Sequence, residues 1–329
     1  MPNVTIYDVA GRAGVSLATV SRVMNNPEKV NEATRERVLA VIKELGYRPN
    51  AIARGLASRK STTVGVVTAD VSRASTAQLL SGIFDIAKKY DYSIKMFAMN
   101  ENEDLKETMR IIVAEQVDGI LFLNDELSEE DMELVLNHIK DAQIPLVLCN
   151  VFFHDDIPTV RIDYEKATYE ITKDLLAKGR KNIYLASTVR KYTINDHKEI
   201  GYVRAMKEAG LEPNIFRTSG DVSVNKLHFN EFLKQKKVDG LIAVRDSIAV
   251  SFINQATLAG YTVPEDISVI GLQNTKYAIL SRPNLTCVDT PVYDIGAVSM
   301  RLLTKLMKQE EIDSTKVVLP YHVIERDSD

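Results

Sequence analysis

Short apolar segments alternate with longer helical patterns along the chain from residue 61 onward. Four runs have the length and composition of buried parallel strands, namely VGVV (64–67), IKMFAM (94–99), DGILFL (118–123) and PLVLC (145–149). Helical spacing of apolar residues separates these runs near 76–90, 103–116 and 128–142. Alternation of strands and helices is typical of α/β domains with a parallel sheet. This part of the chain is therefore predicted to form a doubly wound lobe.

A second set of the same kind follows in the C-terminal half. Its expected strands are IYLAS (183–187), DGLIAV (239–244) and SVIGL (268–272), and its expected helices span 164–178, 197–209 and 247–259. The segments DGIL at 118 and DGLI at 239 occupy comparable places, which indicates two similar lobes. Ligands of doubly wound folds bind beyond the carboxyl ends of the strands. We therefore expect a ligand cleft between the lobes.

The first 47 residues follow a different pattern, which predicts three short helices. The expected helix caps are Thr5, Ser16 and Asn31, and the expected stops are Gly14, Asn25-Asn26-Pro27 and Gly46. The spacing of Thr5 and Asp8 also suits a capping box. Two helices joined by a glycine turn indicate a helix-turn-helix head, although a small bundle with no nucleic-acid partner has the same spacing.

The segment RPNAIARGLASRKS, residues 48–61, has helical spacing but should fold poorly by itself. Asn50 can cap it, and Ile52 and Leu56 lie four residues apart. Helices of this length are marginal in water, and a glycine such as Gly55 lowers helix stability by roughly 1 kcal/mol. Its basic residues, with no acid among them, are Arg48, Arg54, Arg59 and Lys60. The segment is therefore expected to fold only against a partner that neutralises its charge.

Charge is unevenly distributed along the 329 residues. Residues 1–60 hold ten Lys and Arg against five acids, whereas the remainder holds 31 bases and 40 acids. A small basic head on an acidic body indicates that the head contacts a polyanion.

Two cysteines, Cys149 and Cys287, lie in apolar strand-like runs and are expected to be buried free thiols of a cytoplasmic protein. The N-terminus has no secretory signal pattern. No apolar run approaches the ~18 residues of a membrane span, so no membrane partner is expected.

The expected second helix concentrates side chains that can contact nucleic acid. Its first turns hold Leu17, Ala18, Thr19, Ser21 and Arg22. Arg22 can present a bidentate fork to guanine, and Thr19 and Ser21 can reach phosphates or bases. From the residues alone, the same positions also suit an ordinary solvated helix face.

The first sixty residues resemble the DNA-binding head of the LacI family of bacterial repressors. The resemblance rests on VTIYDVAGRAGVSLATVSRVMN and VNEATRERVLAVIKELGYRPNAIARGLAS, and it runs without a gap. It implies a homodimer whose second helices enter the major groove of double-stranded operator DNA. A hinge helix at 48–61 would fold on the operator, with Leu56 as a minor-groove wedge, unless Leu56 only docks on the body. The DNA-contacting residues that the resemblance implies are Thr5, Tyr7, Ser16, Leu17, Ala18, Thr19, Ser21, Arg22, Asn25, Tyr47, Asn50, Ala53, Leu56, Ala57 and Lys60.

In the LacI family the body resembles a periplasmic sugar-binding protein. The implied division is a helix-turn-helix head at 1–47, a hinge helix at 48–61 and a two-lobed regulatory and dimerisation body at 62–329. The first lobe would comprise about 62–161 and 290–320, and the second about 162–289 and 321–329.

The expected cleft departs from the pattern of family members that bind sugars or purines. Asp163 and Asp246 match common family positions, but Lys198 replaces the usual Arg and Gln273 replaces the usual acid. The usual aromatic pair after the first strand is replaced by SRASTAQ (72–78). Because an Arg fork and an acid recognise sugar hydroxyls, we expect weak binding of simple sugars. A small phosphorylated sugar is the candidate effector.

The stretch TPVYDIGAVSMRLLTKLMK, residues 290–308, predicts an amphipathic helix. The residues expected to face the core are Ile295, Ser299, Leu302 or Leu303, and Leu306. By chemistry alone, its other face is an ordinary solvated one. The stretch resembles the helix by which global carbon regulators of the LacI family dock the serine-phosphorylated phosphocarrier protein HPr. The matching residues are Tyr293, Asp294, Val298, Arg301, Leu302 and Lys305, whereas Phe84, on helix 76–90, replaces the acid usual in that branch.

Catalysis is not expected, and neither is a metal or a cofactor. The five histidines, His138, His154, His197, His228 and His322, show no metal-ligand spacing. The chain has no G-x-S-x-G, P-loop or G-x-G-x-x-G motif, and Asp155-Asp156 fits a solvated loop. The sequence predicts a dimeric regulator of carbon catabolite control. A repressor of one sugar-use operon under a small effector is the nearest alternative, and a sugar-binding transport protein is opposed by the basic head.

Overall fold

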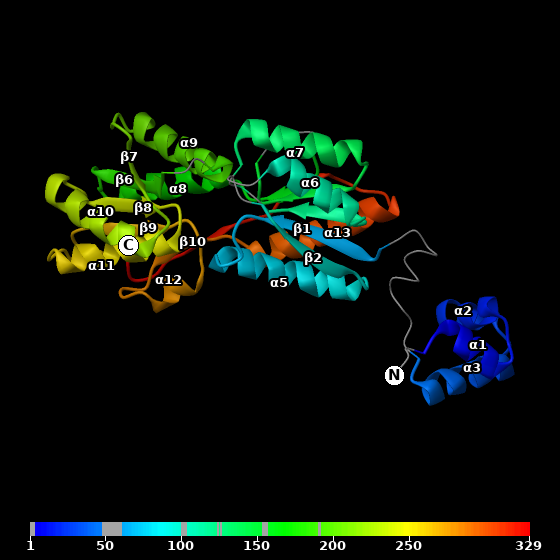
Figure 1. The fold of residues 1–329 in the computed structure, drawn as a ribbon. Helices are drawn as coiled ribbons and strands as arrows, with labels where there is room; N and C mark the ends of the chain where they lie inside the picture. Colours follow the sequence, from blue (N-terminus) through cyan, green and yellow to red (C-terminus); the bar gives the residue numbers. More distant parts are fainter. Residues whose placement is uncertain are drawn as a thin grey trace. The chain divides into compact units, whose positions relative to one another are not determined.

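The structure, a computed structural model, describes residues 4–47, 61–99, 104–123, 125, 127–152, 157–189 and 192–329. The chain divides into two compact units, Met1–Ser61 and Thr62–Asp329 (Figure 1).

The first unit contains the predicted three helices, α1 (Ile6–Ala13), α2 (Leu17–Asn25) and α3 (Glu32–Leu45), with a short 3₁₀ turn, η1 (Pro27–Lys29). Thr5 and Asp8 form the predicted capping box, while Ser16 and Asn31 cap the next two helices. Gly14 and Gly46 adopt φ of 65° and 61°, the left-handed conformation that favours glycine. These local signals alone define the helix ends, so the sequence located them within one residue.

The second unit contains two lobes, each built on a six-stranded sheet. The first sheet has the order β11-β5-β4-β3-β1-β2. Its strands are β1 (Thr63–Thr68), β2 (Ser93–Ala98), β3 (Gly119–Phe122), β4 (Leu146–Cys149), β5 (Thr159–Arg161) and β11 (Lys316–Val318). All pairings in it are parallel. Its helices are α5 (Ala74–Lys89), α6 (Leu105–Ala114), α7 (Glu129–Asp141) and α13 (Val292–Lys308).

The second sheet repeats this arrangement with the order β12-β10-β9-β8-β6-β7. Its strands are β6 (Ile183–Thr188), β7 (Asn214–Thr218), β8 (Gly240–Ala243), β9 (Ser268–Gly271), β10 (Thr286–Asp289) and β12 (His322–Ile324), the last antiparallel to β10. Its helices are α8 (Tyr164–Ala177), α9 (Thr193–Glu208), α10 (Val222–Gln235), α11 (Asp246–Leu258) and α12 (Lys276–Leu280).

Three predictions for the lobes need correction. The run at 94–99 is not a buried strand, because β2 lies at the sheet edge and only Phe97 of that strand is buried. Helix α9 begins four residues before the predicted start, and no side-chain cap marks that start in the sequence. No element was predicted between 210 and 238, where β7 and α10 lie. Their apolar pattern is weak because β7 is also an edge strand.

Three segments connect the lobes, leading from β5 to α8, from β10 to α13 and from β11 to β12 (Figure 1). Helices α8 and α13 thereby follow strands of the opposite lobe. In the first lobe α13 lies against α5, and the approach is very close: a Cβ at Gly296 would stand 2.1 Å from the carbonyl oxygen of Leu79. Glycine at this position lets the two helix backbones touch and brings the outer faces of α5 and α13 side by side.

Candidate DNA-binding head and effector cleft

Helix α2 presents one apolar face to the head core and one polar face to solvent. Val20 and Val23 are fully or almost fully buried between the three helices. The opposite side exposes Leu17, Ala18, Arg22 and Asn25, and it leaves Ser21 half-buried. The side chains of α2 that were predicted to contact DNA are therefore on the side of the helix that faces away from the head core.

Hydrogen bonds hold the start of α2 in place. Ser16 Oγ accepts from the backbone N–H of Thr19 at 3.2 Å and lies 2.9 Å from Thr19 Oγ1. One turn later, Asn25 Nδ2 donates to Ser21 Oγ at 3.3 Å. The hydroxyls are thus ordered on one side of the helix, and Arg22 stands exposed between them.

The remaining predicted contact residues of the head differ in exposure. Tyr7 on α1 is 70% exposed, whereas Tyr47 packs partly against the head core after α3. The Thr5 hydroxyl donates to Asp8 Oδ2 at 2.7 Å and the Thr5 backbone N–H donates to the same oxygen at 2.8 Å, and both bonds lower the pKa of that carboxyl. The predicted hinge residues Asn50, Ala53, Leu56, Ala57 and Lys60 lie outside the described residues.

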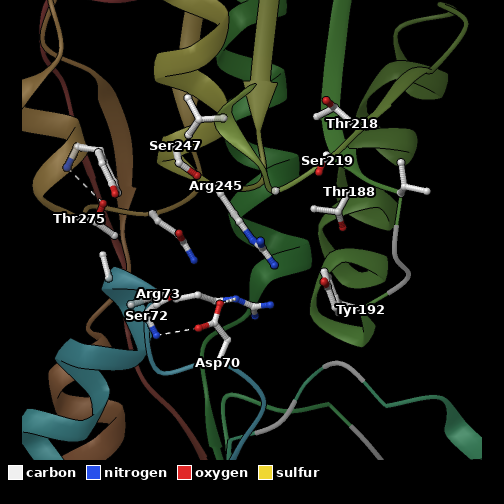
Figure 2. A pocket seen from close by; sticks show the side chains of 17 residues that line it. Asp70, Ser72, Arg73, Thr188, Tyr192, Thr218, Ser219, Arg245, Ser247 and Thr275 are labelled. Carbon is white, nitrogen blue, oxygen red and sulfur yellow. Dashed lines mark hydrogen bonds and ion pairs between the residues drawn. The ribbon is translucent and has the colours of Figure 1, made fainter. Parts of the chain in front are cut away.

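Between the lobes lies a cavity of about 570 Å³ that draws its walls from both (Figure 2). The first lobe contributes Asp70, Ser72 and Arg73 from the β1–α5 connection. The second lobe contributes hydroxyl groups and Arg245, which follows β8. These positions are at the carboxyl ends of the parallel strands, where doubly wound folds bind ligands. The predicted cleft therefore exists, and its charged wall residues are Asp70, Arg73 and Arg245, which the sequence did not assign to it.

Two arginines from opposite lobes approach the ring of Tyr192 in this cavity (Figure 2). The guanidinium carbons of Arg73 and Arg245 lie 5.5 Å and 5.2 Å from the ring centroid. Arg73 also forms ion pairs with Asp70 at 3.6 Å and with Asp125 at 3.4 Å. Burial and the charge of Arg245 lower the pKa of Arg73. Two guanidinium groups in one cavity favour an anionic ligand.

The sequence pattern did not predict that Arg73 and Arg245 line the cleft. Arg73 falls within the SRASTAQ run, which was noted only for its lack of aromatic residues, and Arg245 precedes the expected helix 247–259. The signal available was position, because Arg245 directly follows the expected strand 239–244 and Arg73 lies in the connection that follows the expected strand 64–67. Arg73 and Arg245 are more than a hundred residues apart in the sequence, and they come together because the two lobes meet at the cavity.

The four predicted cleft residues do not all line the cavity. Gln273 does, and Lys198 lines a smaller cavity that adjoins it. Asp246 is buried behind the wall, where its Oδ2 accepts from the backbone N–H of Thr275 at 2.6 Å. Asp163 lines neither cavity: this exposed residue caps α8, with Oδ1 accepting from the N–H of Lys166 at 2.9 Å. A carboxylate that caps a helix start has its position fixed by local geometry.

Lys198 and Asp246 are buried ionisable groups with strongly shifted titration. Burial, assisted by the positive charge of Arg245, lowers the pKa of Lys198 to about 7. Burial raises the pKa of Asp246 to about 6, although hydrogen bonds from Thr275 oppose that rise. Near neutral pH, Lys198 is therefore partly an uncharged amine.

Helix α13 confirms the predicted amphipathic pattern with one correction. Asp294 and Arg301 are exposed, while Val298 and Lys305 are half-buried. Leu302 was assigned to the partner face, but it is only 6% exposed and belongs to the core of the first lobe. Close packing on α5 and on the sheet widens the buried side of α13, so that Leu302 and Leu303 both point inward.

The outer faces of α5 and α13 form one continuous surface, which we call the α5–α13 face and define by Phe84, Asp85, Tyr293, Asp294 and Arg301. Phe84 is 47% exposed and Tyr293 is 43% exposed. The Tyr293 hydroxyl donates to Asp85 Oδ2 at 2.7 Å, which joins the two helices and raises the pKa of Tyr293. A large apolar side chain, an acid and a base thus lie within one surface.

Within the described residues, no group of three or more His, Cys, Asp or Glu side chains is arranged to hold a metal ion. Both cysteines are buried free thiols, as predicted. No helix in the described part of the chain is long and apolar enough to cross a membrane.

Two family models match separate parts of the chain. The model described as bacterial regulatory proteins, lacI family, covers residues 5–50, and the model of a periplasmic binding protein-like domain covers residues 172–328. The fold agrees with a crystal structure of the Lac repressor bound to ONPG in the repressed state, with a TM-score of 0.90 at 25% identity over 99% of this chain and 100% of that chain.

Full-length relatives are more similar in sequence. Catabolite control protein A of Priestia megaterium is 42% identical over 99% of both chains, and that of Staphylococcus xylosus is 39% identical over 97% of both. The crystal structure of the regulator CcpA of Lactococcus lactis matches 81% of this chain and 98% of its own with a TM-score of 0.73 at 31% identity.

Proposed function

Because the chain belongs to the LacI family of DNA-binding transcription regulators, we propose that it acts in carbon catabolite control, as a dimer on a pseudo-palindromic operator. The observation that carries this proposal is the exposed polar face of α2 in a head of matching sequence. Arg22 would form a bidentate contact with guanine, and Thr19 and Ser21 would contact phosphates or bases. Ser16, Leu17, Ala18 and Asn25 complete the major-groove side, while Thr5, Tyr7, Tyr47 and the hinge residues would contact DNA around it.

Exposed apolar side chains on the second lobe support the dimer. Ile279 and Leu280, on the short helix α12, are 57% and 67% exposed. Neighbouring apolar side chains of this size on a surface are typical of protein interfaces. A second copy of the chain would cover them.

The α5–α13 face supports a protein corepressor, the serine-phosphorylated form of HPr that the sequence resemblance implies. A phosphoserine carries nearly two negative charges and three acceptor oxygens. Arg301 can bond two of these oxygens at once with its planar fork, and Lys305 would add a point charge at the rim. Val298 supplies apolar contact beside them, Tyr293 packs at the edge and Asp294 pairs with a base of the partner.

The corepressor proposal is tested by operator binding with phosphorylated HPr, unphosphorylated HPr or no partner. Arg301→Ala should abolish the gain in operator affinity produced by phosphorylated HPr, because the phosphate loses its bidentate donor. Partner-free DNA binding should stay unchanged. Arg110→Ala is the matched control, since Arg110 is an exposed arginine on α6 of the same lobe. A variant at Arg301 that responds to the partner as wild type does would contradict the proposal.

The cleft favours a second candidate function, repression of a single sugar-use operon under a small effector. Arg73 and Arg245 make the cavity suited to an anion such as a phosphorylated sugar. Calorimetry with glucose and glucose 6-phosphate distinguishes the ligands, and only the phosphorylated sugar should bind in the micromolar range. Arg245→Gln should weaken that binding about tenfold or more, as loss of a charge-assisted hydrogen bond predicts. Micromolar binding of free glucose would contradict the anionic assignment.

A further inference from the structure

Lys198 lies in a small cavity at the back of the effector cleft. This cavity, of about 60 Å³, is lined by Lys198 together with Asn150, Tyr164 and Asp125. It shares Arg73, Arg245 and Gln273 with the large cavity, so the two cavities adjoin at these residues. A water molecule occupies roughly 10–15 Å³ by such a measure. The small cavity therefore has room for the end of a short carbon chain, but not for a sugar ring.

The amine is held in a defined place by its surroundings. Lys198 is 1% exposed, and its Nζ donates to the backbone carbonyl of Val244 at 3.0 Å. Nζ also lies 4.8 Å from the ring centroid of Tyr164. Val244 directly precedes Arg245, so the amine and the guanidinium are positioned by the same short segment after β8.

Burial makes this lysine a nucleophile at neutral pH. With a pKa of about 7, the amine of Lys198 is uncharged in roughly half of the molecules at pH 7, whereas an ordinary lysine, with a pKa of 10.5, is uncharged about a thousandfold less often. Lysines desolvated in this way, next to another cation, are typical of sites that form Schiff bases with carbonyl compounds.

A further polar atom is available in the cavity wall. Asn150 Nδ2 donates to the Tyr164 hydroxyl at 3.0 Å, while Asn150 Oδ1 is buried and has no hydrogen-bond partner in the described part of the chain. Buried polar atoms are normally paired. Asn150 and Lys198 line the same cavity, so this open acceptor can bind a hydroxyl group that forms there.

We propose that Lys198 captures a short-chain phosphorylated aldehyde as an imine, while Arg73 and Arg245 hold its phosphate. The inference rests on the proposed anionic effector site, and it adds a covalent contact and an aldehyde specificity to that site. An arginine, usual at this position in sugar-binding relatives, could not form the bond.

The reaction needs no group beyond the protein and the aldehyde. The Nζ lone pair attacks the carbonyl carbon, the C–O π electrons move to oxygen, and a proton passes from nitrogen to that oxygen. The resulting carbinolamine hydroxyl can donate to Asn150 Oδ1. The remaining proton of the nitrogen then passes to this hydroxyl, which leaves as water while the nitrogen lone pair forms the C=N bond between the ligand and Lys198. Water reverses the sequence, so the capture responds to the aldehyde concentration.

Reductive trapping tests the proposal on the full chain. The protein is incubated at pH 7 with glyceraldehyde 3-phosphate and cyanoborohydride, and peptides are analysed by mass spectrometry. The yield of adduct on Lys198 should exceed the yield on Lys207, an exposed lysine of the same helix, about tenfold or more. The reason is that the amine of Lys198 is uncharged in a far larger fraction of the molecules, and the arginines hold the phosphorylated aldehyde next to it. The preference should be several-fold smaller for glyceraldehyde, which has no phosphate for the two arginines to hold, and for the Arg245→Gln variant with the phosphorylated aldehyde.

A second measurement tests imine formation and phosphate binding independently of each other. Lys198→Arg should form no adduct at position 198 but should still bind glycerol 3-phosphate in calorimetry, since both cleft arginines remain. Equal labelling of Lys198 and Lys207, with glycerol 3-phosphate bound by the wild type, would overturn the imine while leaving the effector site intact. Failure of the wild type to bind glycerol 3-phosphate would overturn the effector site and the imine together.

Discussion

Among single residues, Lys198 is unusual because it is an ionisable side chain buried at the cleft. Lys198 is enclosed almost completely, and its charged form is penalised because water cannot solvate it. The unfolded chain has no such penalty, and its lysine titrates near the ordinary value of 10.5. Between about pH 7 and 10.5 the unfolded state therefore binds more protons than the folded state, and the contribution of Lys198 to stability rises with pH.

Lys198→Met should remove this rise. From pH 7 to pH 9 the free energy of unfolding of the wild type should increase relative to that of the variant by about 2 kcal/mol. Urea denaturation at the two pH values measures the difference, and Lys207→Met, on the exposed side of the same helix, should show no such change. Parallel pH profiles for the wild type and Lys198→Met would mean that the buried amine keeps its proton.

At the scale of elements, the contact between α5 and α13 depends on glycine. The Cβ of an alanine at position 296 would lie 2.1 Å from the Leu79 carbonyl oxygen, and one at position 82 would lie 2.0 Å from that of Tyr293. Both obstacles are backbone atoms, which cannot rotate away as a side chain can. The helices must therefore separate if either glycine is replaced.

Gly296→Ala should lower the free energy of unfolding of the body by about 1–3 kcal/mol, the usual cost of overpacking. It should also weaken partner binding, because the α5–α13 face spans both helices. Chemical denaturation followed by circular dichroism provides the measurement. Gly11→Ala, within α1 and with nothing near its added Cβ, is the control and should be neutral or stabilising. Unchanged stability of Gly296→Ala would show that the two helices separate at little cost.

At the scale of the whole molecule, the question is how the head responds to ligands on the body. The basic segment between the described head and body is the predicted hinge, which we expect to fold only on DNA. On this hypothesis, binding of the proposed effector or corepressor to the lobes regulates DNA binding by favouring or opposing the folded hinge in both subunits of the proposed dimer.

Leu56→Ala tests this hinge. The variant should lose about 2 kcal/mol or more of operator binding, because a wedge stabilises the bent minor groove that it opens. Binding to random DNA is mostly ionic and should change little. Gel-shift titrations on operator and random duplexes give both values. Equal losses on the two DNAs would show that Leu56 serves another purpose, such as docking on the body.

The helices of the head could be predicted from the sequence alone, because the signals that begin and end them are local. Thr5, Ser16, Asn31, Gly14 and Gly46 specify where three helices begin and end within a few residues of each signal. The alternation of apolar runs likewise predicted the α/β class and seven of the twelve strands in the described residues, whereas β5, β7, β10, β11 and β12 were not predicted. The exposed side of α2 followed from helical periodicity and needed no knowledge of distant contacts.

Which residues line the cleft depends on the tertiary structure, and local sequence patterns do not predict it. Arg73, Tyr192 and Arg245 are far apart in the sequence, and they meet because two sheets place the carboxyl ends of their strands around one cavity. The same holds for Leu302, whose burial depends on how closely α13 approaches α5. Local patterns specify elements through short-range hydrogen bonds and periodicity, whereas a site between lobes depends on packing, which no single segment encodes.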